Sequence, residues 1–285
     1  MLAPNESVIN LALRRSDKDI YRHVNATYYV NFAYDAFLQT LFRAEIATEE
    51  QLRSKDRLFF LSHAQIHYIK GIEKTDSVLV KTSVSTAQPH CFSSTFSVVN
   101  EAMSVTFTQG ELVINDVSLL KKNKNHSRNA HFNPYSALCD GVSRKARVFE
   151  RLCDVRFTDL DPLGIVRPSF YLDAVVSSRW TYLEKDLGVS VLELAERGFG
   201  VYLVSSNVEC FSPIARTLPI RVRSYVAVTE KKLMKVRFEI RSDDLSVIFA
   251  NGEFDSLMID LKTRKTQILP SWVEPYIYER GDFSN

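Results

Sequence analysis

Glycine is scarce in this sequence, at 9 of 285 residues, where about 7% is usual. Loops that cradle nucleotide phosphates need glycines, because only glycine lets the backbone approach a phosphate closely. The one local hint, Gly198-Phe199-Gly200, has no third glycine until Gly252, and no Gly-Lys-Ser or Gly-Lys-Thr triplet occurs. The sequence therefore argues against a nucleotide-binding loop.

Cysteine is also sparse, and the four residues are far apart with no CxxC spacing: Cys91, Cys139, Cys153 and Cys210. A disulfide framework needs a higher density, so we expect reduced, structural thiols. The motif G-x-S-x-G is absent, which disfavours a serine hydrolase of the nucleophile-elbow type. His63 and His67 are four apart, but the HEXXH pattern fails and the segment reads as a strand, which separates them by roughly 13 Å. We therefore expect no metal site.

Neither sign of charge is in excess, since 36 Lys and Arg face 34 Asp and Glu, for a formal charge of +2. Such a balance gives no electrostatic footprint for nucleic acid or an anionic membrane. The N-terminus lacks a basic segment followed by an apolar one, and no stretch reaches the ~18 uninterrupted apolar residues of a membrane span. We expect a soluble cytoplasmic protein whose partners include neither nucleic acid nor membrane.

An internal repeat organises the chain, because segments 13–29 and 155–171 share one frame at an offset of 142 positions. The matched pairs are Arg14 and Arg156, Asp17 and Asp159, Asp19 and Asp161, Val24 and Val166, and Tyr29 and Tyr171. The offset is half the chain, so we predict a duplicated domain. The polar, basic segment around 120–129 predicts a solvated connection. The expected division is a first domain over 1–119, a linker over 120–147 and a second domain over 148–285.

Each half carries the same sequence of secondary-structure patterns. Helical spacing of apolar residues predicts long helices over about 26–45 and 169–183, which bury Phe32, Phe37, Val175 and Val176 against a sheet. Alternating apolar residues predict four strands after each helix: 59–69, 78–86, 92–100 and 105–115, then 201–211, 220–228, 234–240 and 247–259. The expected fold class is α+β, with one long helix on one face of an antiparallel sheet in each half.

Two motifs carry a family resemblance. Asp19-Ile20-Tyr21-Arg22-His23-Val24-Asn25, followed by Tyr29, resembles the D-x-x-x-HVNN-x-x-Y signature of hotdog-fold acyl-CoA thioesterases, close to the long-chain branch. Asp159-Leu160-Asp161-Pro162-Leu163-Gly164-Ile165-Val166 resembles the D-x-D-P-x-G-I-V signature of the 4-hydroxybenzoyl-CoA thioesterase branch. The family fold is a long helix wrapped by an antiparallel sheet, normally as a dimer, so a tandem chain resembles that dimer made covalent: a double hotdog.

The resemblance implies a site built from a carboxylate and the start of a helix. Thioester hydrolysis needs a carboxylate that attacks or activates water, and donors for the developing oxyanion. The resemblance implies that the carboxylates are Asp19 and Asp161. In the first copy the donor is the N–H of Ala26, seven residues after Asp19. The second copy has Pro168 at that place, and proline lacks an N–H. We therefore expect the first site to work and the second to be degenerate.

The neighbouring motif residues have structural as well as functional interpretations. Asn25 stands where a helix cap belongs, which we favour over substrate contact. His23 either holds the loop through a buried hydrogen bond, which we favour, or tunes Asp19. Arg167 replaces Asn25 in the second copy, where it is a surface residue or contacts a CoA phosphate. Arg22 and Ala26 depart from the family pattern, but neither change removes the backbone N–H.

The predicted function is hydrolysis of an acyl-CoA thioester to a free acid and CoA, with no metal or organic cofactor. The acyl chain is expected in a tunnel beside the long helices, lined by Tyr29, Phe32 and Tyr171, with CoA across the junction of the halves. Two alternatives stay open. One is an acyl-carrier-protein thioesterase, which the N-terminal place of the HVN motif and Tyr21 make less favoured. The other is a non-catalytic acyl-CoA-binding protein with two degenerate sites. Double-hotdog chains can also associate into homo-oligomers.

Overall fold

A computed structural model describes residues 5–19, 23–54, 57–73, 75–88, 90–116, 147–215, 217–229, 233–268 and 271. The predicted linker over 120–147 lies outside the described residues except for Arg147, as do Arg22 and Cys139. The other three cysteines are free thiols.

The first half runs through β1 (Glu6–Ala12), α1 (Tyr28–Arg43), α2 (Glu49–Arg53), β2 (Phe59–Tyr68), β3 (Ser77–Gln88), β4 (Cys91–Val99) and β5 (Thr106–Asp116). The second half repeats it with β6 (Val148–Asp154), α3 (Phe170–Leu187), α4 (Val191–Glu196), β7 (Phe199–Cys210), β8 (Pro219–Thr229), β9 (Leu233–Ser242) and β10 (Ile248–Asp260). Most elements start 142 positions after their counterparts. The predicted tandem hotdog, α+β fold is thus confirmed.

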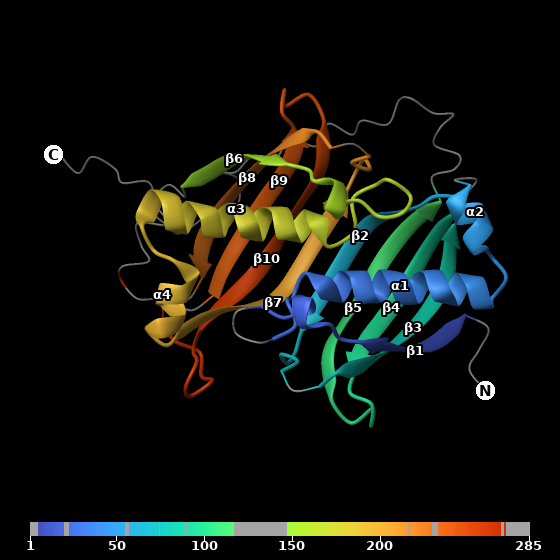
Figure 1. Cartoon of the computed structure of the whole chain (residues 1–285), viewed down its shortest axis with the longest axis horizontal. Helices are drawn as coiled ribbons and strands as arrows, with labels where there is room; N and C mark the ends of the chain where they lie inside the picture. The colour runs from blue at the N-terminus through green and yellow to red at the C-terminus, as the bar shows by residue number, and fades with distance from the viewer. Residues whose placement is uncertain are drawn as a thin grey trace.

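The strands form one antiparallel sheet in the order β1-β3-β4-β5-β2-β7-β10-β9-β8-β6. This order reads the same from either edge once each strand is replaced by its repeat, and β2 pairs with β7 at the centre. Gln65 lies opposite Asn207, its own counterpart 142 positions later, so a pseudo-twofold axis passes through that pair. Both long helices lie on the same side of the sheet (Figure 1).

Apolar periodicity explains why these segments fold as they do. On α1, Tyr29, Ala33, Phe37 and Leu41 recur at intervals of four and are at most 3% exposed, so one helix face is buried. Alternate residues of β3 are likewise buried, as a sheet covered on one face requires. The buried residues form two separate cores, one under each long helix.

Three expectations about the helices need correction. The long helices span Tyr28–Arg43 and Phe170–Leu187, and the second continues a turn beyond its predicted end, to a left-handed cap at Gly188. Two short helices, α2 and α4, were not predicted, although Thr48 and Gln51 form a capping box that signals α2. Val176 packs against the core of the second half but is only partly buried, because it also lines a cavity.

The segment that contains His63 and His67 is a strand, as expected. His63 and His67 lie on β2, and His63 Nε2 is 2.8 Å from Asn207 Oδ1 across the central strand pair. None of the helices among the described residues is long and apolar enough to cross a membrane.

Truncating Phe37 to alanine should destabilise the fold by about 3–5 kcal/mol, because a fully buried aromatic ring leaves a cavity that neighbours fill only partly. Phe37 is 0% exposed and packs edge-on against Phe59 and Phe92. Denaturant unfolding of the variant measures the change in the free energy of unfolding. A loss below about 0.5 kcal/mol, typical of surface positions, would show that this helix face is wrongly placed.

Candidate functional site

The Asp19 motif folds into a closed loop before α1. The Asp19 N–H donates to the His23 carbonyl at 2.7 Å, and the His23 N–H donates back to Asp19 Oδ1 at 3.1 Å. An isolated bridge between Lys18 and Val24, and a bond from the Val24 N–H to the Ile72 carbonyl, hold the loop on the body of the first half. The main chain of the loop therefore fixes where the Asp19 carboxylate stands.

The start of α1 lies beside that carboxylate. Asn25 Oδ1 accepts hydrogen bonds from the N–H and the hydroxyl of Thr27, at 3.2 and 3.1 Å. The N-cap is Thr27, so Asn25 supports the helix start from two residues earlier rather than as the cap itself. The Ala26 N–H has no hydrogen-bond partner among the residues that the structure describes. It is a donor at the positive end of a helix, where a negative charge is favoured.

His23 stabilises the loop with its side chain. The residue is 3% exposed, its Nε2 is 2.8 Å from Glu73 Oε1, and its ring packs edge-on against Tyr202 of β7. Arg264, just after β10, reaches the same Glu73 at 3.1 Å. The ring of His23 thus links the two halves while its backbone orients Asp19, an arrangement that fits the structural interpretation.

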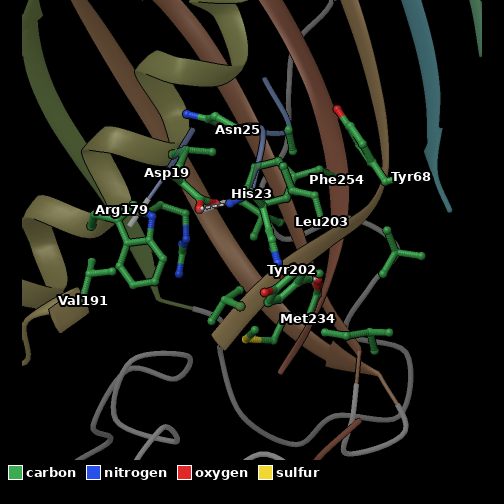
Figure 2. Close-up of a pocket in the computed structure, with 18 of the residues that line it drawn as sticks. Asp19, His23, Asn25, Tyr68, Arg179, Val191, Tyr202, Leu203, Met234 and Phe254 are labelled. Carbon is green, nitrogen blue, oxygen red and sulfur yellow. Dashed lines mark hydrogen bonds between the residues drawn. The ribbon is translucent and has the colours of Figure 1, made fainter. Parts of the chain in front are cut away.

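A cavity of about 950 Å³ opens beside these groups. Asp19, His23, Asn25 and Ala26 line its mouth, and Figure 2 shows the hydrogen bond that the His23 N–H donates to the Asp19 carboxylate there. Its walls come mainly from the second half, whose apolar lining includes Val176, Leu183, Leu194, Leu203, Val236 and Phe254. The motif of the first half therefore faces a tunnel between α3 and the sheet of the second half.

The expected tunnel lining is only partly right. Tyr29 lines the cavity, whereas Phe32 is packed into the core of the first half and Tyr171 lies beside Asp161. The prediction placed these aromatics in one tunnel because it could not tell that each motif faces the opposite half.

The second motif repeats the loop but has no comparable space beside it. Asp161 donates its N–H to the Ile165 carbonyl at 2.7 Å, and Asp161 Oδ1 accepts the Ile165 N–H at 3.2 Å, as in the first copy. The void next to Asp161 and Pro168 measures only about 10 Å³. The next backbone donor, the Ser169 N–H, is bonded to Asn31 Oδ1 at 2.9 Å. Burial raises the pKa of the Asp161 carboxyl, and three backbone N–H groups of its loop lower it in part.

Arg167 does not mark an anion site by its geometry. It is exposed, and its guanidinium donates to the Thr158 carbonyl in the same loop. This contact favours the structural interpretation over a CoA phosphate contact.

Aromatic side chains under α1 fill the space that corresponds to the tunnel under α3. Phe37, Phe59 and Phe92 meet under α1 with ring centroids 5.7 to 5.8 Å apart. Their counterparts 142 positions later, under α3, are Arg179, Val201 and Met234, and all three line the cavity. Tyr34 of α1 fills space beside Asp161, where its counterpart in α3 is the smaller Val176. Large rings thus occupy the space under α1 that stays open under α3.

A second carboxylate, which sequence reasoning missed, lies at the mouth of the cavity. Asp173 of α3 accepts a hydrogen bond from the Thr27 hydroxyl at 2.5 Å and lines the cavity. Burial raises the pKa of the Asp173 carboxyl, while its hydrogen bonds lower it in part. The repeat offset is the sequence signal for this residue, because Asp173 lies 142 positions after Asn31. Asn31 makes the corresponding contact with the start of the other long helix, at the Ser169 N–H.

Comparisons with known proteins agree with this architecture. Residues 155–276 match the family model described as the Thioesterase-like superfamily. No curated protein matches the chain.

Three solved structures resemble nearly the whole chain. A putative oleoyl thioesterase from Lactobacillus plantarum has a TM-score of 0.65 at 13% identity and covers 88% of this chain and 96% of its own. The 12:0-ACP thioesterase from Umbellularia californica has a TM-score of 0.61 at 10% identity, and the match covers 92% of this chain and 94% of that structure's chain. An acyl-ACP thioesterase from Bacteroides thetaiotaomicron has a TM-score of 0.59 at 10% identity, and the match covers 90% of this chain and 100% of that structure's chain. At these identities the likeness shows the fold.

The match within the second half confirms the resemblance of the second motif to this superfamily, and the shared doubled fold confirms the tandem hotdog architecture. The chain is thus a tandem hotdog protein whose C-terminal half matches the Thioesterase-like superfamily.

Proposed function

We propose that this chain hydrolyses acyl-CoA thioesters at the Asp19 site, with the acyl group in the tunnel under α3. One observation carries the proposal: the Asp19 carboxylate and the unpartnered Ala26 N–H stand together at the mouth of a cavity large enough for an acyl chain. The predominantly apolar walls favour a hydrocarbon or aromatic acyl group.

In this mechanism the thioester carbonyl oxygen faces the start of α1. The Ala26 N–H donates to that oxygen, and the helix dipole stabilises the negative charge that develops there. Asp19 either takes a proton from the attacking water, or attacks the carbonyl carbon itself to form a mixed anhydride that water then hydrolyses, which regenerates the carboxylate. The carbon–sulfur bond breaks, the free acid forms, and CoA leaves as a thiol after it gains a proton.

Asp173 serves as a positioning residue in this scheme. Its hydrogen bond to the Thr27 hydroxyl joins the second half to the start of α1, one residue after the donor. The bond thereby holds the Ala26 N–H over the tunnel that the second half encloses.

An acyl-carrier-protein thioester is the second candidate substrate. Two of the full-length structural neighbours are acyl-ACP thioesterases by name, and they share the doubled fold. Both substrate types place the same thioester at the same site, so the mechanism above applies to either. The third candidate is a protein that binds the acyl group in the tunnel without hydrolysing the thioester. Pro168 favours loss of catalysis in the second copy only, because the first copy keeps its donor.

A thioester-cleavage panel tests the proposal. The purified chain is assayed with acyl-CoA thioesters of graded length and with aromatic acyl-CoA thioesters, and the freed thiol is detected. The same acyl groups are supplied on a carrier protein in parallel. We expect the chain to cleave acyl-CoA thioesters at least as efficiently as the carrier-protein thioesters of the same acyl groups. Cleavage of carrier-protein thioesters alone would support the second candidate, and binding without cleavage of any substrate would support the third.

A further inference from the structure

A cationic side chain without an acidic partner lies in the wall of the apolar tunnel. Arg179 projects from α3 and lines the cavity (Figure 2), and its Nη1 atom is fully buried with no hydrogen-bond partner. Among the residues that the structure describes, no carboxylate forms a salt bridge with it. Burial lowers the pKa of this guanidinium to about 10, so it still carries its charge at neutral pH.

This charge stands where the first half has a hydrophobic ring. Its counterpart 142 positions earlier is Phe37, which packs against Phe59 and Phe92. A guanidinium nitrogen that is buried without a partner is unfavourable, and the contact with the Phe149 ring, 5.2 Å from Cζ, offsets only part of that cost. An arginine at this core position therefore points to a ligand that brings the missing negative charge.

The position of Arg179 relative to the reaction centre limits that ligand. Arg179 follows Asp173 by six residues on α3, which is about 9 Å along the helix axis. Asp173 itself bonds to Thr27 beside the proposed oxyanion donor. The Arg179 side chain thus leaves α3 nearly two turns beyond Asp173 and lines the cavity. Three carboxylates line the cavity, and none of them forms a salt bridge with Arg179: Asp19 accepts the His23 N–H, Asp173 accepts the Thr27 hydroxyl, and Glu184 is exposed.

We infer that the tunnel takes acyl groups that carry a second carboxylate away from the thioester, and that Arg179 binds this carboxylate. The inference rests on the proposed function for the orientation of the acyl group. Arginine is suited to the task, because its planar guanidinium donates two parallel hydrogen bonds to a carboxylate. The substrate class is then the CoA monothioester of a dicarboxylic acid, aliphatic or aromatic.

Paired ligands of equal length test the inference. Suberoyl-CoA, which ends in a carboxylate, and octanoyl-CoA, which ends in a methyl group, are titrated calorimetrically into the Asp19→Asn variant, where hydrolysis does not interfere. We expect suberoyl-CoA to bind at least about tenfold more tightly, as a charge-assisted hydrogen bond in a buried site allows. In the same Asp19→Asn background, Arg179→Met should abolish this preference and Arg179→Lys should retain part of it. The control Arg221→Met, on a partly exposed arginine of β8 that does not line the cavity, should leave it unchanged.

The outcomes separate this inference from the proposed function. Equal affinity for the two ligands, or a preference that survives Arg179→Met in a variant with an unchanged melting temperature, overturns the role of Arg179 even if the parent protein cleaves octanoyl-CoA. Selective binding of suberoyl-CoA that depends on Arg179, in a parent protein that cleaves neither ligand, supports the carboxylate site and overturns hydrolysis instead. If Arg179→Met fails to fold, the preference for suberoyl-CoA is compared between Asp19→Asn and the same variant with Arg179→Lys. A reduced preference with lysine supports the role of Arg179, and an unchanged preference overturns it.

Discussion

Ala26→Pro is expected to lower turnover about 10²- to 10³-fold, the usual effect of removing one oxyanion donor. Proline deletes the Ala26 N–H and leaves the Asp19 carboxylate in place. The substitution is structurally acceptable, because the second copy has Pro168 at the equivalent position with the same loop hydrogen bonds and an intact helix start.

The control for this variant is Ala26→Ser, which retains the backbone N–H and should keep turnover within a few-fold of the parent. Steady-state kinetics give kcat and KM for both variants, and circular dichroism with thermal unfolding checks that both fold. Because the lost bond strengthens as charge develops, the loss should appear in kcat more than in KM. An Ala26→Pro variant with parental kcat would show that another group binds the oxyanion.

Asp19→Asn is expected to remove nearly all turnover, since the loss of a positioned base or nucleophile commonly costs about 10²-fold or more. An amide is neither a base nor a nucleophile at neutral pH. Its Oδ1 can still accept the His23 N–H, the bond that Asp19 Oδ1 makes at 3.1 Å, so the loop should keep its shape. Turnover is measured by thiol release, and binding of acyl-CoA is measured separately by calorimetry. Unchanged binding with lost turnover would assign Asp19 to the chemistry, whereas loss of both would assign it to binding.

The repeat explains how much of the fold could be predicted. The offset between Asp19 and Asp161 already implied the duplicated elements, and the alternation of apolar residues located all eight strands that follow the long helices. These signals are local, since they depend on residues within a few positions of one another. The helix ends and the short helix α2 were less accessible, because caps such as Thr48 with Gln51 decide them over a single turn.

The candidate site was only half accessible from the sequence. The motif predicted Asp19 and the Ala26 donor, because both lie in one loop. The contribution of Asp173 depends on contact with Thr27 across the pseudo-twofold axis, 146 positions away in the chain. The location of the tunnel depends on a difference in bulk between Phe37 and Arg179 and between their neighbours, which has a meaning only once the two halves are superposed.

The central claim is that the two copies of the motif differ, with one reactive site at Asp19. The most direct measurement is turnover of Asp19→Asn and Asp161→Asn side by side, on one acyl-CoA that the parent protein cleaves. The account predicts near-complete loss for Asp19→Asn and a change of only a few-fold for Asp161→Asn, because Pro168 removes the donor and the void beside Asp161 is about 10 Å³. An essential Asp161 with a dispensable Asp19, or equal losses in both variants, would contradict it.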